Sequence, residues 1–280
     1  MDNAATNRQS MTGNMKNSSK ALILILFFAS QLSWAETASD LEKEKRWSEQ
    51  ITDSLVVGES CTLDAAGSPF LGIYTEASEG PSSRAVILLH GIGAHPDWPE
   101  VINPLRSDLP DLGWTTLSIQ MPVLANDAKI QDYAPLFAEV GPRIEAAIQY
   151  LRDRDADTLV LIGHSLGASM AATWVANSQT KDINGLVLIG LGVITADARM
   201  NSLPALEKIH IPVLDLYGSR DLESVTASAK KRLSAANKSG NEKYRQLSVE
   251  GADHFFVGLE ADLTRRVYGW LKSNFEKDKE

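Results

Sequence analysis

Cysteine and stretches of basic residues are scarce in this sequence. Its 280 residues include one cysteine, Cys61, so no disulfide forms within the chain, and we expect Cys61 to pack as a small apolar residue. The net charge is −9 with no basic stretch, which argues against a nucleic-acid partner. No histidine stands with cysteine and carboxylates at metal-ligand spacing. The sequence therefore predicts no metal and no cofactor.

The apolar run near the N-terminus is short. It covers residues 21–29, whereas a bilayer span needs about 20 apolar residues. Lys16 and Lys20 precede it, and Ser33-Trp34-Ala35 ends in small residues at the positions that a signal peptidase recognises. We predict a secretory signal peptide over residues 1–35, cut before Glu36. The protein is then expected in the periplasm, or outside the cell, with no stable membrane span; an uncleaved anchor is the alternative.

Short apolar segments alternate with helical ones over residues 36–280, which predicts a single domain with a mostly parallel eight-stranded sheet and helices on both faces. The first two strands are expected to pair as an antiparallel hairpin across the turn at residues 65–69. The expected strands are Leu55–Cys61, Phe70–Tyr74, Ala85–Leu89, Trp114–Ile119, Thr158–Ile162, Gly185–Ile189, Pro212–Tyr217 and Tyr244–Val249. The main expected helices are Asp40–Ile51, Glu100–Leu109, Leu136–Arg154, Val225–Asn237 and Glu260–Phe275.

The pentapeptide Gly163-His164-Ser165-Leu166-Gly167 lies between a buried strand and a segment rich in helix formers. A serine on so sharp a turn needs a strained backbone, and a Cβ at either flanking glycine would press on the neighbouring strand and helix. The first amides of the following helix are unpaired and face the place where an oxyanion would develop. We interpret the pentapeptide as a nucleophile elbow; an ordinary Gly/Ser turn is the alternative.

A nucleophilic serine needs a base, and the base needs an acid that orients it. In parallel sheets such groups gather just beyond the carboxyl ends of strands. Asp221 follows one predicted strand through Gly218-Ser219-Arg220, and His254 follows another through residues 250–253. Asp215 lies within its strand and Glu223 lies farther into the loop, so both are poorer candidates. The alternatives are a helix cap for Asp221 and a solvated loop residue for His254.

The order Ser165, Asp221, His254, together with the elbow and the strand pattern, resembles the α/β-hydrolase superfamily. The similar segments are His90-Gly91-Ile92, the elbow, residues 218–221 and residues 251–255. The resemblance implies that Ser165 is the nucleophile, His254 the general base and then acid, and Asp221 the orienting carboxylate. It also implies an oxyanion hole made by the backbone amides of Ile92 and Leu166.

This machinery predicts a serine hydrolase that cleaves a small-molecule carboxylic ester through an acyl-enzyme. Thioester or amide cleavage, acyl transfer, a peptidase that uses the same triad, and a binding protein without catalysis remain alternatives. The excursion Gly190–Ile211 is short, so a large cap is not expected. Candidate substrate-binding residues are His90, Gly91, Met121 and Trp98, of which His90 alternatively supports its turn and Trp98 anchors its loop. The sequence sets no oligomeric state.

Overall fold

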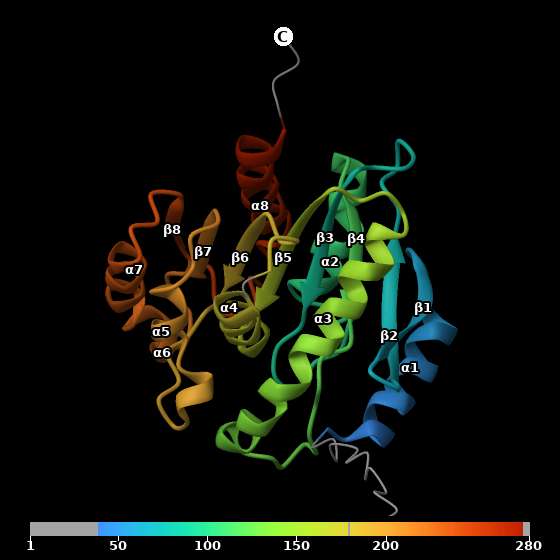
Figure 1. Ribbon diagram of the computed structural model, residues 1–280, viewed down its shortest axis with the longest axis horizontal. Coiled ribbons are helices and arrows are strands. Elements are labelled where there is room, and N and C mark those ends of the chain that lie inside the picture. Colours follow the sequence, from blue (N-terminus) through green and yellow to red (C-terminus); the bar gives the residue numbers. More distant parts are fainter. Residues whose placement is uncertain (1–38, 179, 277–280) are drawn as a thin grey trace, which may run out of the picture. The chain divides into compact units, whose positions relative to one another are not determined.

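Eight short strands form one sheet in the computed structural model, which describes residues 39–178 and 180–276. Within this part of the chain the strands are β1 (Glu59–Ala65), β2 (Ser68–Thr75), β3 (Arg84–Leu89), β4 (Thr115–Ile119), β5 (Thr158–His164), β6 (Gly185–Ile189), β7 (Val213–Gly218) and β8 (Tyr244–Val249). The α-helices are α1 (Leu41–Ser54), α2 (Ile102–Asp108), α3 (Phe137–Arg152), α4 (Leu166–Ser178), α5 (Ser202–Leu206), α6 (Glu223–Thr226), α7 (Ala229–Lys238) and α8 (Glu260–Phe275). Figure 1 shows how these elements follow one another.

The strand order is β1-β2-β4-β3-β5-β6-β7-β8. Strand β2 runs antiparallel to both of its neighbours, and all later pairs are parallel. The mostly parallel sheet expected from the sequence is therefore confirmed. Because β3, β5, β7 and β8 run in the same direction, the segments that follow them emerge at one edge of the sheet.

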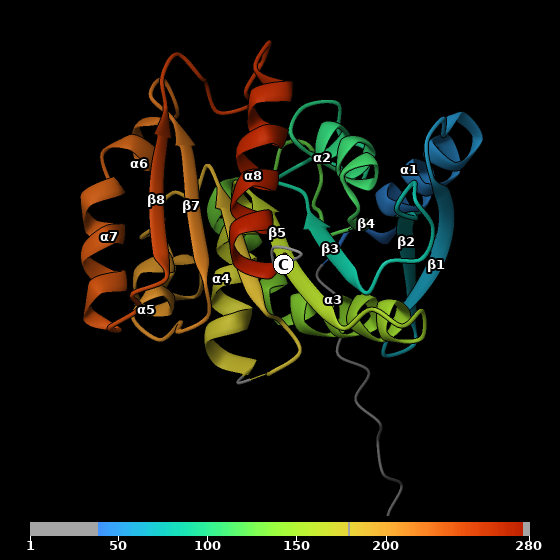
Figure 2. The ribbon, with the colours of Figure 1, turned by 90° about the horizontal axis from the view of Figure 1, so that it is seen from above.

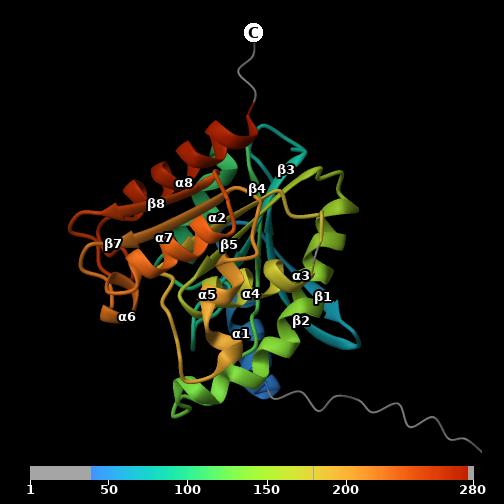
Figure 3. The ribbon, with the colours of Figure 1, turned by 60° about the vertical axis from the view of Figure 1, so that its left-hand side comes forward.

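Side chains of β3 alternate between two apolar layers, as the period of a strand requires. Ile87 and Leu89 pack in the layer that includes residues of α3, α4 and α7. Val86 and Leu88 face the other layer, with residues of α2 and α8. Figures 2 and 3 show the sheet between α2 and α8 on one side and α3 and α4 on the other. Both faces are covered, so the sheet is a rigid base for the edge that carries the candidate site.

The first strand lies farther along the chain than predicted. We expected Leu55–Cys61, but β1 begins at Glu59, and Val56 is 93% exposed. The two-residue turn at Ala66 and Gly67, both with positive φ, pairs Ala65 with Ser68 and so fixes the register of the hairpin. The apolar segment at residues 55–57 therefore resembles a strand only by propensity, because pairing is set from the turn.

The helix predicted over Val225–Asn237 is divided in two. Helix α6 ends at Thr226 and α7 begins at Ala229. Between them, the Ser228 hydroxyl donates to the carbonyl oxygens of Ser224 at 2.5 Å and Val225 at 3.0 Å. A serine that bonds to the preceding turn in this way competes with the helical ladder.

The predicted signal peptide, residues 1–35, and its cut before Glu36 lie outside the described residues. Helix α1 is capped by Asp40, whose carboxylate accepts from the Lys43 amide at 2.9 Å. For the described ranges, no helix has the length and apolar character that crossing a bilayer would require.

Candidate active site

Ser165 occupies a strained turn between β5 and α4. Its φ is 55°, in the left-handed region that a non-glycine residue rarely adopts, and its amide donates to the Ile189 carbonyl at 2.8 Å. A Cβ on Gly163 would lie 2.6 Å from the Gly167 carbonyl oxygen, and one on Gly167 would lie 2.4 Å from the Leu89 carbonyl oxygen. Both flanking positions therefore need glycine, for the packing reason that the sequence suggested.

Ser165, His254 and Asp221 form one hydrogen-bonded series. The His254 Nε2 is 2.9 Å from the Ser165 Oγ, and the His254 Nδ1 is 2.6 Å from the Asp221 Oδ1. Because a carboxylate only accepts, Nδ1 carries the proton and Nε2 accepts from the serine hydroxyl. Asp221 and His254 are 8% and 7% exposed, so both side chains are shielded from water. This is the arrangement that activates an oxygen nucleophile.

The loop that carries Asp221 is fixed by its own backbone. The Asp221 Oδ1 also accepts from the Leu222 amide at 2.7 Å. A Cβ on Gly218 would lie 2.2 Å from the Ala252 carbonyl oxygen, so the loops after β7 and β8 touch at a glycine. The poorer acid candidates lie elsewhere: Asp215 is fully buried against Arg232 at 2.7 Å, and Glu223 is exposed at the start of α6.

The loop that carries His254 packs against the loop after β6. Gly190 has φ of +60°, and a Cβ there would lie 2.9 Å from the His254 ring. Beneath the site, His164 donates from Nε2 to the His254 carbonyl at 3.0 Å. Burial, with a smaller contribution from the charge of His254, lowers the His164 pKa to about 4. His164 is therefore a neutral support at ordinary pH.

Two backbone N–H groups near the serine have no acceptor among the residues described, those of Ile92 and Leu166. Leu166 directly follows Ser165 at the start of α4. Gly91 stands beside the serine, because a Cβ at Gly91 would lie 3.1 Å from the Ser165 Cβ. Unpaired donors near a serine hydroxyl are what an oxyanion hole would require.

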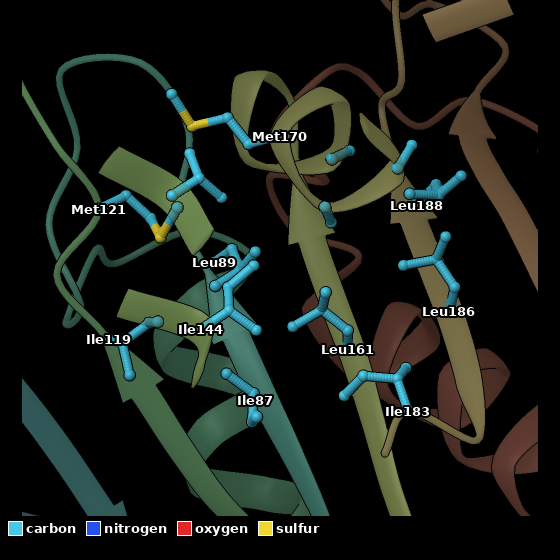
Figure 4. Packing of buried hydrophobic residues seen from close by; sticks show 14 of the residues in the cluster. Ile87, Leu89, Ile119, Met121, Ile144, Leu161, Met170, Ile183, Leu186 and Leu188 are labelled. Carbon is cyan, nitrogen blue, oxygen red and sulfur yellow. The ribbon is translucent and has the colours of Figure 1, made fainter. Parts of the chain in front are cut away.

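The other candidate substrate-binding residues are placed differently. His90 and Met121 are each 1% exposed, so neither offers surface to a substrate. Figure 4 shows Met121 packed among core side chains near Met170. The His90 Nε2 accepts from the Met121 amide at 2.8 Å, and its Nδ1 donates to the Gly91 carbonyl at 2.9 Å. His90 therefore supports its turn, which was the alternative that the sequence left open.

Trp98 anchors its loop through ring contacts. Its ring lies 5.2 Å from the His95 ring, and the His95 ring lies 5.4 Å from that of Trp47 on α1. Both contacts have T-shaped geometry, which stabilises aromatic pairs. The loop after β3 is thereby attached to the N-terminal helix. The remaining histidine, His210, is exposed between α5 and β7.

Sequence reasoning missed the buried polar residues behind His90. The Gln120 Nε2 lies 3.0 Å from the His90 Nε2, and the Arg143 guanidinium donates to the Gln120 carbonyl at 2.9 Å. Arg143 also pairs with Glu44. The one available signal was an arginine on the otherwise apolar face of the predicted helix 136–154.

Apolar side chains are exposed next to the site residues. Ile92, Leu222, Phe255 and Val257 are 41%, 52%, 41% and 62% exposed, and each lies on a loop that carries a site group. Within residues 39–178 and 180–276, histidine, cysteine and carboxylate side chains form no group of three or more that would hold a metal ion.

Comparison with solved structures shows the same fold in serine hydrolases. Est1E from Butyrivibrio proteoclasticus is 15% identical with a TM-score of 0.59, and the match covers 78% of this chain and 99% of Est1E. The Pyrococcus furiosus esterase Pf2001 is 17% identical with a TM-score of 0.62, covering 80% and 93%. An alpha-beta serine hydrolase homologue from Coxiella burnetii is 18% identical with a TM-score of 0.59, covering 76% and 99%. At these identities the likeness establishes the fold alone, as the sequence predicted.

Comparison with curated protein sequences gives no match. A family model described as "Protein of unknown function (DUF3530)" matches residues 19–140 and 134–273, which is most of the chain. The chain therefore belongs to the DUF3530 family, and its fold is that of the α/β serine hydrolases.

Proposed function

We propose that this protein is a serine hydrolase that cleaves carboxylic esters through an acyl-enzyme. The observation that carries the proposal is the continuous series from the Ser165 Oγ through His254 to Asp221, with contacts of 2.9 and 2.6 Å. Serine at the elbow supports acyl transfer rather than the chemistry of an aspartate nucleophile. The exposed apolar side chains beside the site suit the acyl or alcohol portion of an ester.

In the proposed reaction the Ser165 Oγ attacks the ester carbonyl while its proton passes to the His254 Nε2. The carbonyl oxygen becomes an oxyanion and accepts from the N–H groups of Ile92 and Leu166. His254 then gives its proton to the departing alcohol, which leaves Ser165 acylated. Water then attacks the acyl carbonyl while its proton passes to His254. The bond between the acyl carbon and the Ser165 Oγ breaks, the carboxylic acid is released, and His254 returns the proton to Ser165. Asp221 holds the imidazole in the correct tautomer throughout.

The comparisons support the ester class. Est1E and Pf2001 share the fold, Pf2001 is an esterase, and Est1E has also been solved with ferulic acid bound. Ferulic acid is a carboxylic acid, the kind of product that an ester hydrolase releases. A thioester, an amide or an acyl-acceptor alcohol would use the same groups, so the tests below include a thioester.

We also propose that the protein is exported and acts in the periplasm or outside the cell. The support is the sequence of residues 1–35, with two lysines before a short apolar run and small residues before Glu36. Fractionation of the producing cells, with mass spectrometry of the N-terminus, tests this proposal. A mature chain that begins at Glu36 supports export, and an intact N-terminus in the membrane fraction favours the uncleaved anchor.

The decisive experiment for the activity combines hydrolysis and labelling. The purified protein is assayed on p-nitrophenyl esters of increasing acyl length and on a matching thioester, and is treated with a fluorophosphonate. We expect turnover and a label on Ser165, both lost in Ser165→Ala and His254→Ala. If the wild-type protein shows no turnover and takes up no label, a binding protein on a hydrolase fold is favoured.

A further inference from the structure

A buried ion pair joins helix α1 to helix α3 behind the oxyanion side of the site. The Glu44 Oε2 is 2.9 Å from the Arg143 Nη1, and the Glu44 Oε1 is 3.1 Å from the Arg143 Nη2. Glu44 is 6% exposed and Arg143 is 3% exposed. Such a pair adds little net stability over apolar residues of similar volume, because both charges must be desolvated. The contacts of Arg143 beyond Glu44 are therefore of interest.

The guanidinium of Arg143 reaches the peptide that joins Gln120 to Met121. The Arg143 Nη1 donates to the Gln120 carbonyl at 2.9 Å, and the N–H of the same peptide, that of Met121, donates to the His90 Nε2 at 2.8 Å. A trans peptide is planar, and its C=O and N–H point in opposite directions. Arg143 and His90 therefore hold one rigid peptide from its two sides.

The ring of His90 connects this peptide to a second one, the peptide that joins Gly91 to Ile92. Because the Met121 N–H only donates, the His90 Nε2 accepts, and the proton of the neutral ring is on Nδ1. Burial lowers the His90 pKa to about 3, which keeps the ring neutral. The Nδ1–H donates to the Gly91 carbonyl at 2.9 Å, and the N–H of that peptide is the unpaired one of Ile92.

We infer that Arg143 is a positioning residue for the oxyanion hole, acting on the Ile92 N–H through two peptides and the ring of His90. This inference rests on the proposed hydrolase function. Every donor in the series points the same way, from Arg143 to the Gln120 carbonyl, from Met121 to His90, from His90 to the Gly91 carbonyl, and from Ile92 to the oxyanion. Aligned hydrogen bonds polarise one another in a low-dielectric interior, so the positive charge strengthens the last donor as well as fixing its direction.

Helix α1 becomes part of the catalytic apparatus through this series. Glu44 orients Arg143, and the segment around Glu44 is tied to the chain that follows Gln120. The Asp40 amide donates to the Val123 carbonyl at 2.7 Å, and the Lys43 Nζ donates to the Leu124 carbonyl at 2.8 Å. Figures 1 and 3 show the beginning of α1 beside this segment, which leads towards α3.

The test separates stabilisation of the oxyanion from binding of the substrate. We would measure kcat and KM on a p-nitrophenyl ester and the Ki of an alkyl trifluoromethyl ketone, which adds the serine and forms an oxyanion. In Arg143→Met we expect about a tenfold fall in kcat and a matching rise in Ki with KM unchanged, below the 10²–10³ lost when a donor is removed outright. Arg143→Lys, which keeps a positive charge, should recover part of both.

The matched control is Arg232→Met. Arg232 is as deeply buried and is paired with Asp215 at 2.7 Å, but its partners lie on β7, on α6 and at Ser228 between α6 and α7 rather than on the oxyanion side. The Arg232→Met variant should be less stable than the wild-type protein, with the Ki of the ketone little changed. To follow the donor itself, the ¹H shift of the ¹⁵N-labelled Ile92 amide should move upfield in Arg143→Met, including in a sample that is folded but inactive.

The outcomes are distinct. Parallel losses in kcat and ketone affinity, absent from Arg232→Met, support the inference. An active Arg143→Met with wild-type kcat, Ki and Ile92 shift overturns it and leaves the hydrolase function standing. If Arg143→Met does not fold, Arg143→Lys decides: a raised ketone Ki with a shifted Ile92 amide supports the inference, and a wild-type Ki with an unshifted amide overturns it. A wild-type protein that neither turns over esters nor binds the ketone overturns the function, and the inference with it.

Discussion

The two sides of the candidate site are held in place by different means. The triad side comprises the loops at residues 218–222 and 250–256, and neighbouring backbone fixes it: the Arg220 amide donates to the Ala252 carbonyl at 2.9 Å, and the Ser219 amide donates to the Val249 carbonyl at 2.9 Å. The oxyanion side comprises residues 90–93 and 120–121, and side chains from α1 and α3 fix it. Adjacent strands place Asp221 and His254, whereas the turn at Ile92 is connected to residues that lie far apart in the sequence.

Removing a triad group should have the largest effect. We expect Ser165→Ala to lower kcat by at least about 10⁴-fold, because the residual rate then comes only from the oxyanion donors and binding. Initial rates on a p-nitrophenyl ester measure the loss. Ser169→Ala is the matched control, since Ser169 is a buried serine on α4 whose hydroxyl has no partner among the described residues. Equal rates for wild type and Ser165→Ala would contradict the triad.

Removing the Glu44–Arg143 ion pair should affect stability and rate separately. Arg143→Met leaves the Glu44 carboxylate buried without its partner, which costs about 3–5 kcal/mol in the free energy of unfolding. Glu44→Leu combined with Arg143→Met removes both charges, so urea denaturation should show most of that stability recovered. If Arg143 sets the Ile92 N–H, kcat stays low in the double variant. Recovery of both quantities together would show that the pair is only structural.

Crowding the triad side at a residue outside the triad should lower the rate with little loss of stability. A Cβ in Gly190→Ala would lie 2.9 Å from the His254 ring and displace it, and a misplacement of about 1 Å costs about 10²-fold in rate. Gly240→Ala is the control, because Gly240 also has positive φ, +70°, but nothing lies within 4 Å of the added Cβ. Both variants should lose about 1 kcal/mol from backbone strain. Only Gly190→Ala should lose activity.

The same contrast explains what the sequence predicts well. Ser165, Asp221 and His254 each follow a strand within a few residues, so short-range rules place all three at the same edge of the sheet, where the structure brings them together. The glycines of the elbow were identified for a packing reason that their close contacts bear out. Strand alternation likewise predicted the sheet.

Long-range contacts explain what the sequence did not predict. Glu44 and Arg143 are 99 positions apart, and no local pattern pairs them. Met121 was considered for substrate because of its apolar side chain, but the sequence does not show that α3 and α4 would enclose it. The start of β1 was misplaced because the turn at Ala66 and Gly67, rather than strand propensity at residues 55–57, sets the pairing.

The smallest predicted effect concerns pH and involves two buried histidines, His90 on the oxyanion side and His164 beneath the serine. Burial lowers the pKa of His90 to about 3 and of His164 to about 4, from 6.5. Since the unfolded chain takes up protons first, the stability from these neutral rings is complete above pH 6.5 and is lost as pH falls towards the folded pKa values. At pH 5 burial of each neutral ring should lower the free energy of unfolding by about 2 kcal/mol relative to its value at neutral pH. The difference between the urea midpoints at neutral pH and at pH 5 should therefore be smaller in His90→Gln and in His164→Gln than in the wild-type protein. The exposed His210 provides the control. If His210→Gln reduces the difference between the two urea midpoints as much as either buried variant does, burial of the rings is not the cause of that difference.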